Sequence, residues 1–157
     1  QAVWALYEEL KRCGCGQIGY VGWDAVGMCS VREREAAYRE KAGAQGVFLH
    51  MPWKEKSRLE EIVRMVFGQR REELPDALIC SDQEVGGAVL RAARGLGIHI
   101  RVATVDEIAE KGRGDVVLYR QDLDGTIARI FACLLAQCGD GGGWRADIYR
   151  ISGILMF

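Results

Sequence analysis

Residues 75–106 read PDALICSDQEVGGAVLRAARGLGIHIRVATVD, and this stretch decides the fold class. It contains a short apolar run at 77–80, a longer segment rich in helix-forming residues, and a second apolar run at 100–105. Ser81 and Glu84 have the spacing of a capping box, which opens a helix. The stretch therefore predicts a buried strand, a helix and a second buried strand.

The same alternation continues on both sides of this stretch. Before it, we expect helices at 2–13 and 31–42, strands at 17–22 and 46–51, and a helix opened by the capping pair Ser57 and Glu60. After it, we expect a strand at 116–119, a helix at about 123–138 and a tail of two short strands bent at Gly153. Nearly continuous apolar strands are typical of a sheet that is covered on both faces. We therefore expect an α/β fold with an open, mainly parallel sheet and helices on both faces.

The composition indicates one folded domain. The chain has 157 residues, of which 49% are hydrophobic, and its 21 Lys and Arg nearly balance its 22 Asp and Glu. This balance gives no reason to expect non-specific binding to nucleic acid, and no apolar run is long enough to cross a membrane. We expect no metal and no cofactor. The six cysteines lack zinc-site spacing, and we expect them to be free thiols in a reducing cytoplasm.

Polar side chains recur directly after the predicted strands. In an open parallel sheet, ligands bind outside the carboxyl ends of the strands. Trp23 and Asp24 follow one strand, Ser81 follows another, and Asp106 ends a third. Arg34 lies early in the next helix, where its guanidinium can donate to the hydroxyls of a ligand.

Some of these candidate residues and motifs also have a purely structural interpretation. The alternative interpretation of Ser81 is a helix cap, and that of Asp82 is a first-turn carboxylate, and both roles stabilise a helix without any ligand. His50 ends a strand and lacks a nucleophilic partner motif. The run GCGQIG at 14–19 follows a helix and precedes a strand, the reverse of a dinucleotide-binding loop, so we interpret it as a turn. No nucleophile, base and oxyanion grouping is visible, and we expect no enzyme.

Several stretches resemble the ligand-sensing region of LacI/GalR-type repressors and their relatives, the periplasmic sugar-binding proteins. They are PDALICSDQEVGGAVLRAARGLGI (75–98), RVATVDE (101–107), VLYRQDLDGTIARIFACLLAQ (117–137), and QIGYVG (17–22) with REAAY (34–38). The resemblance implies one lobe of a type I periplasmic-binding-protein-like fold. In that family, two such lobes flank a cleft that holds the effector.

The resemblance also implies a domain organisation. Residues 1–157 are expected to be the C-terminal part of an effector-binding domain, with 1–113 and 144–157 in the second lobe. The segment 114–143 would pack on the first lobe. DNA would be bound only through a helix-turn-helix domain that these residues do not contain. Homodimers of the family use the helix that corresponds to 83–96, so a homodimer is expected.

Carried over residue by residue, the resemblance places sugar-contacting positions on this chain. The arginine falls on Arg34, and Ser81 stands where the family has asparagine. Trp23 or Trp53 would cover the apolar face of a sugar. The expected ligand-binding residues, for a sugar or polyol effector, are Arg34, Ser81, Asp106, Gln121, Trp23 and Asp24. The expected function is a cytoplasmic transcriptional regulator; the alternative is an exported sugar-binding protein of a transporter.

Overall fold

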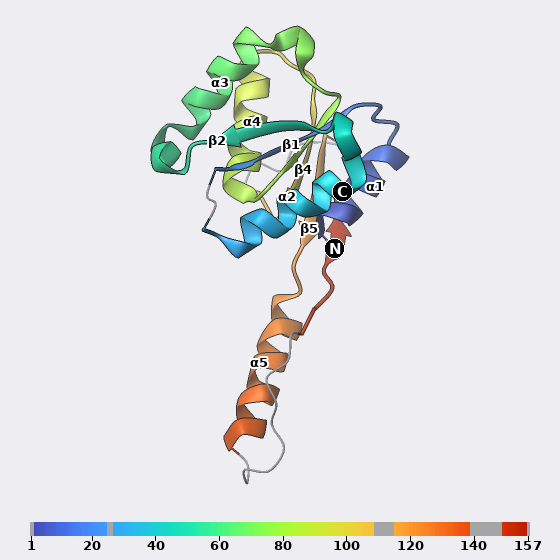
Figure 1. Ribbon diagram of the computed structural model, residues 1–157, viewed down its shortest axis with the longest axis vertical. Coiled ribbons are helices and arrows are strands. Elements are labelled where there is room, and N and C mark those ends of the chain that lie inside the picture. The colour runs from blue at the N-terminus through green and yellow to red at the C-terminus, as the bar shows by residue number, and fades with distance from the viewer. Residues whose placement is uncertain (1, 25–26, 109–114, 139–148, 157) are drawn as a thin grey trace.

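The computed structural model describes residues 2–24, 27–108, 115–138 and 149–156, which build one twisted sheet with helices around it (Figure 1). The strand order is β2-β1-β3-β4-β5-β6; the first five strands are parallel and β6 is antiparallel to β5. The strands are β1 (Ile18–Trp23), β2 (Val47–Met51), β3 (Ala77–Cys80), β4 (Arg101–Val105), β5 (Val116–Arg120) and β6 (Ile154–Met156). The expected α/β class with a mainly parallel sheet is confirmed.

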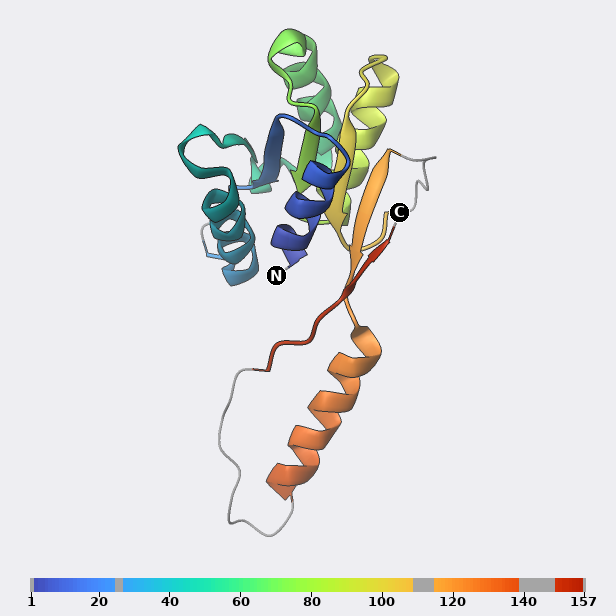
Figure 2. The same ribbon diagram turned by 90° about the vertical axis from the view of Figure 1, so that its right-hand side faces the viewer.

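Helices cover both faces of this sheet (Figure 2). They are α1 (Ala2–Arg12), α2 (Cys29–Ala42), α3 (Leu59–Gln69) and α4 (Gln83–Gly95), whereas a fifth helix, α5 (Leu123–Cys138), lies apart from the sheet. Helices α3 and α4 share one apolar cluster with alternate residues of the central strands, and α1 and α2 share a second cluster with the others. Strands with both faces buried need apolar residues at every position, which explains the continuous apolar runs.

Helix α1 ends in the glycine-rich turn that the sequence predicts. Its last turn is closed by backbone hydrogen bonds from Gly14 to Lys11 and from Cys15 to Leu10. Gly14 has φ of +84°, a left-handed conformation that favours glycine. The chain then enters β1, so the GCGQIG run connects a helix to a strand, and its interpretation as a turn is confirmed.

Helix α5 is the exception to the layered arrangement. It leaves the carboxyl end of β5 and projects away from the sheet in both views (Figures 1 and 2). None of its residues is buried, although the helix carries the apolar stripe that the sequence predicts. Its exposed large apolar side chains are Leu123, Ile127, Ile130, Phe131, Leu134 and Leu135.

Three local predictions are corrected by the structure. Arg58, not Ser57, precedes α3 and makes no side-chain cap, because residues 53–58 form a 3₁₀ turn. Asp82, not Ser81, caps α4. In the tail, two strands were expected, but among the described residues 149–156 only β6 is present and 149–153 form no strand. Residues 144–148 lie outside the described residues, and so do the expected domain boundaries at 113/114 and 143/144.

Candidate functional site

The predicted site residues lie at one edge of the sheet. Trp23 ends β1 and Asp24 follows it, Ser81 follows β3, Asp106 follows β4, and Gln121 follows β5. These four strands are parallel neighbours, so their carboxyl ends meet at the same edge. We call this the carboxyl edge.

Arg34 reaches the carboxyl edge from α2. Its Nη1 donates a hydrogen bond to the backbone carbonyl of Ser81. Ser81 is fully buried, so this carbonyl has no contact with solvent, and the guanidinium is its recorded partner. The structure therefore places Arg34 at the end of β3, and the neighbouring strand is β4, which Asp106 follows.

Asp82 organises the centre of the carboxyl edge. Its Oδ1 caps α4 by accepting from the backbone N–H groups of Glu84 and Val85, at 3.0 and 3.1 Å. Its Oδ2 accepts from the indole Nε1 of Trp23 at 2.7 Å and from the hydroxyl of Ser81 at 2.9 Å. The polar groups of Trp23 and Ser81 thus point to Asp82, and Asp82 takes the capping role that the sequence assigns to Ser81.

Asp106 and Gln121 form a pair at the ends of adjacent strands. Gln121 Nε2 lies 2.7 and 2.9 Å from the two carboxylate oxygens of Asp106. Asp106 has a left-handed backbone, with φ of +73°. Among the described residues, no other residue except glycine has this conformation. A left-handed backbone at a non-glycine residue is concentrated at functional sites, and here it belongs to a carboxylate that is held by the residue following the next strand. The sequence gives no sign of this conformation.

Asp24 and two tryptophans form the flank of the carboxyl edge nearest β2. Asp24 Oδ1 accepts from the backbone N–H of Trp53 at 2.7 Å. The rings of Trp23 and Trp53 meet edge to face, with centroids 5.2 Å apart. Trp23 is only 3% exposed, whereas Trp53 is 39% exposed. Of the two, Trp53 therefore presents the larger aromatic surface to solvent.

A hollow of about 440 Å³ opens next to these tryptophans. Its lining includes the apolar residues Trp23, Val31 and Ala36 and also Asp24, His50 and charged side chains of α2. Within this lining, Glu35 lies 2.6 Å from Arg39 and 3.2 Å from His50. Burial alone would raise the pKa of Glu35, but the hydrogen bonds to Arg39 and His50 outweigh it and lower that pKa.

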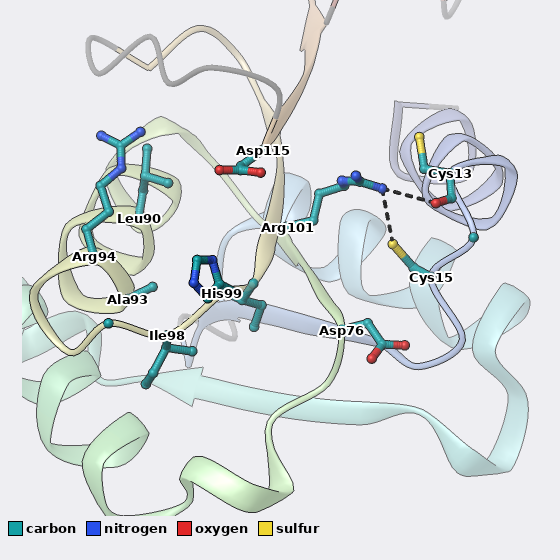
Figure 3. A pocket seen from close by; sticks show the side chains of 13 residues that line it. Cys13, Cys15, Asp76, Leu90, Ala93, Arg94, Ile98, His99, Arg101 and Asp115 are labelled. Carbon is teal, nitrogen blue, oxygen red and sulfur yellow. Dashed lines mark hydrogen bonds between the residues drawn. The ribbon is translucent and has the colours of Figure 1, made fainter.

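A second hollow, of about 510 Å³, lies at the opposite, amino edge of the sheet (Figure 3). Arg101 Nη1 donates there to the carbonyl of Cys13 at 3.2 Å and lies 3.8 Å from Cys15 Sγ. Asp76 Oδ2 accepts from the backbone N–H groups of Gly16 and Gln17, both at 2.8 Å. These contacts fix the loop between α1 and β1, and none of the predicted site residues lines this hollow.

Two kinds of feature are missing from the part of the chain that the structure describes. It contains no group of three or more histidine, cysteine or carboxylate residues able to hold a metal ion. None of its helices is both long and apolar enough to span a lipid bilayer.

The sequence profile of one family matches most of the chain. This family is described as the periplasmic binding protein-like domain, and the match covers residues 7–150. No curated protein matches the chain.

Several solved structures share this fold. The Escherichia coli transcriptional repressor AscG is 20% identical, with a TM-score of 0.76 over 100% of this chain and 59% of that one. A Caulobacter myo-inositol binding protein bound to myo-inositol is 15% identical, with a TM-score of 0.75 over 99% of this chain and 56% of that one. A LacI family transcriptional regulator from Lactobacillus casei with bound sucrose is 16% identical, with a TM-score of 0.75 over 100% and 61%. The chain thus spans about three fifths of the length of these structures.

Proposed function

Since the chain belongs to the family of periplasmic binding protein-like domains, we propose that it forms the effector-sensing lobe of a LacI-type transcriptional regulator. The effector is a small polyol or sugar. Two structures of similar fold carry such molecules, myo-inositol in one and sucrose in the other.

The observation that carries this proposal is the set of polar groups at the carboxyl edge. Arg34 offers a planar fork of donors, and the carboxylate of Asp106 accepts hydrogen bonds from hydroxyls. Gln121 holds that carboxylate in place. A ring of adjacent hydroxyls needs this combination of donors and acceptors, and Trp53, which is 39% exposed on the flank nearest β2, supplies an aromatic side chain at the same edge.

The proposal includes a second lobe that faces the carboxyl edge. Residues 1–113 and 144–157 would form the lobe described here, and 114–143 would pack on the other. The bare apolar stripe of α5 supports this arrangement, because a contiguous apolar face of this kind calls for a partner surface. An effector that contacts both lobes stabilises the closed form only by the difference between its affinities for the closed and open forms.

Control of DNA binding would follow from that closure. The regulator would act as a homodimer, in which α4 lies at the subunit contact, and a helix-turn-helix domain would read operator DNA. Residues 2–24, 27–108, 115–138 and 149–156 contain free cysteines and no disulfide, which favours a reducing cytoplasm.

The alternative function is the lobe of an exported binding protein that delivers sugar to a transporter. The fold of the Caulobacter myo-inositol binding protein favours it as much as the repressor fold favours regulation, because the two TM-scores are 0.75 and 0.76. The coding sequence upstream of Gln1 separates the two functions: a helix-turn-helix there supports the regulator, and a signal peptide there contradicts it.

Calorimetric titration of the protein as its gene encodes it tests the polyol site. The panel is myo-inositol, sucrose and glucose, and we expect saturable binding of at least one. Arg34→Gln should weaken this binding by about tenfold or more, because a hydrogen bond to a charged group contributes about 1.5–3 kcal/mol. Arg94→Gln, at the amino edge, is the matched control and should bind like the wild type. Binding of no panel member, or equal binding by Arg34→Gln, contradicts the proposal.

A further inference from the structure

Tyr20 lies inside the lobe, directly beneath the carboxyl edge. Its ring is fully buried on β1 and stacks on Tyr38, with centroids 5.4 Å apart. A Cβ atom built on Gly22 would lie 2.7 Å from the Tyr20 ring and 3.2 Å from its hydroxyl oxygen. The hydroxyl therefore points along β1 toward the carboxyl edge, and it lies over Gly22.

The Tyr20 hydroxyl has no hydrogen-bond partner. Among the described residues, it is the only buried side-chain nitrogen or oxygen atom without one. Tyr38, its stacking neighbour, differs: the Tyr38 hydroxyl donates to the carbonyl of Ile18 at 2.7 Å and accepts from the N–H of Val47 at 3.1 Å. Burial raises the pKa of Tyr20, while the nearby charge of Arg34 opposes that rise. The phenol thus stays protonated, as a donor without an acceptor. An unsatisfied buried donor destabilises the protein, so its presence calls for an explanation.

The strand register brings one acceptor, the backbone carbonyl of Ser81, to this end of β1. The register pairs Val21 with Cys80, and the N–H of Ser81 donates to the carbonyl of Val21 at 2.8 Å. Ser81 consequently lies level with Gly22 on the neighbouring strand, and Gly22 is the residue that the Tyr20 hydroxyl overlies. The buried carbonyl of Ser81 is occupied by Arg34 in this structure.

We propose that Tyr20 is a positioning residue for Arg34. The Tyr20 hydroxyl donates to the Ser81 carbonyl whenever an effector draws the Arg34 guanidinium away from that carbonyl. This inference rests on the proposed function, because it requires Arg34 to bind the effector. Without Tyr20, the movement of Arg34 would leave a buried carbonyl unpaired, and the effector would bind more weakly by that cost. With Tyr20, one hydrogen bond replaces another, so Arg34 can turn to the ligand freely.

The variant Tyr20→Phe tests this exchange, because it removes the hydroxyl and keeps the stacked ring. In the protein as its gene encodes it, we expect affinity for the panel member that binds best to fall by about tenfold, equivalent to about 1.4 kcal/mol. We expect the midpoint of chemical denaturation of the ligand-free protein to stay equal or rise, since an unsatisfied donor is removed. A merely structural hydroxyl would produce the opposite pattern, with lower stability and unchanged affinity.

Tyr38→Phe is the matched control. It removes a hydroxyl that has two partners, so it should lower the denaturation midpoint and leave affinity unchanged. If Tyr20→Phe binds as tightly as the wild type, or if it loses stability as Tyr38→Phe does, the inference is overturned while the proposed function stands. If the wild type binds no member of the panel of myo-inositol, sucrose and glucose, both are overturned.

Discussion

Gln121 holds both carboxylate oxygens of Asp106, at 2.7 and 2.9 Å, across the ends of two adjacent parallel strands. The pair joins residues fifteen positions apart in the chain. It aims the carboxylate of a residue whose backbone has φ of +73°, so local strain and a side-chain contact both fix the position of one acceptor. An acceptor fixed before binding loses little conformational entropy when a ligand arrives.

Asp106→Asn should weaken polyol binding by about tenfold or more, because the charged acceptor is lost. Asparagine tolerates a left-handed backbone, so the free energy of unfolding should change by no more than about 0.5 kcal/mol. Calorimetry and chemical denaturation of the same preparation measure the two quantities. Unchanged affinity in a folded Asp106→Asn protein would remove Asp106 from the site.

Asp82→Ala should lower the free energy of unfolding by about 2–4 kcal/mol. It removes the α4 cap, worth about 1 kcal/mol, and leaves the buried N–H of Trp23 without a partner. Asp82→Asn keeps the cap oxygen but places an amide N–H against the Trp23 N–H, so it should lose about 1–3 kcal/mol, which is about 1 kcal/mol less than Asp82→Ala. Equal losses in the two variants, measured by chemical denaturation, would argue against the cap as a separate contribution.

The ion pair between Glu9 and Arg12 predicts a pH-dependent contribution to stability. Their side-chain atoms approach to 2.6 Å, and the hydrogen bond from Arg12 lowers the pKa of Glu9. A carboxylate with a lowered folded-state pKa stabilises the protein above its unfolded-state pKa, and this contribution disappears as pH falls through the folded-state value. The wild type should therefore be more stable than Arg12→Gln at neutral pH, and denaturation curves of the two should converge in acid. A difference that stayed constant with pH would contradict this assignment.

The exposed apolar stripe of α5 predicts self-association of the 157-residue chain. Light scattering should show a mass that rises with concentration, and the double change Ile130→Asp with Phe131→Asp should abolish the rise. Met65→Asp is the control, because Met65 is 56% exposed but lies on α3. A strict monomer with an exposed α5 would contradict the prediction.

Much of the fold was predictable because burial leaves a strong pattern in the sequence. Strand β3 and helix α4 lie where the apolar run and the helical segment of 75–106 place them. The family resemblance is confirmed by the profile match over residues 7–150. The exposure of α5 does not follow from its apolar stripe, which by itself indicates a buried face.

The site was less predictable because it depends on contacts between distant residues. The Arg34 contact with Ser81 spans 47 positions, and the Trp23 contact with Asp82 spans 59. A capping-box spacing favoured Ser81 as the cap, but Asp82 competes better for the helix N–H groups and also accepts from Trp23. No residue pattern predicts the left-handed backbone of Asp106.

Mapping of polyol binding by nuclear magnetic resonance tests the central claim most directly. A single lobe supplies about half of the contacts, so binding to the 157-residue chain should be weak, and chemical shifts detect weak binding. Titration of the isotopically labelled chain with myo-inositol, sucrose or glucose should move the backbone amide signals of Asp24, Ser81, Asp106 and Gln121. Signals of Asp76 and Asp115 at the amino edge should stay fixed. Movement confined to the amino edge, or no movement at saturating polyol, would contradict the account.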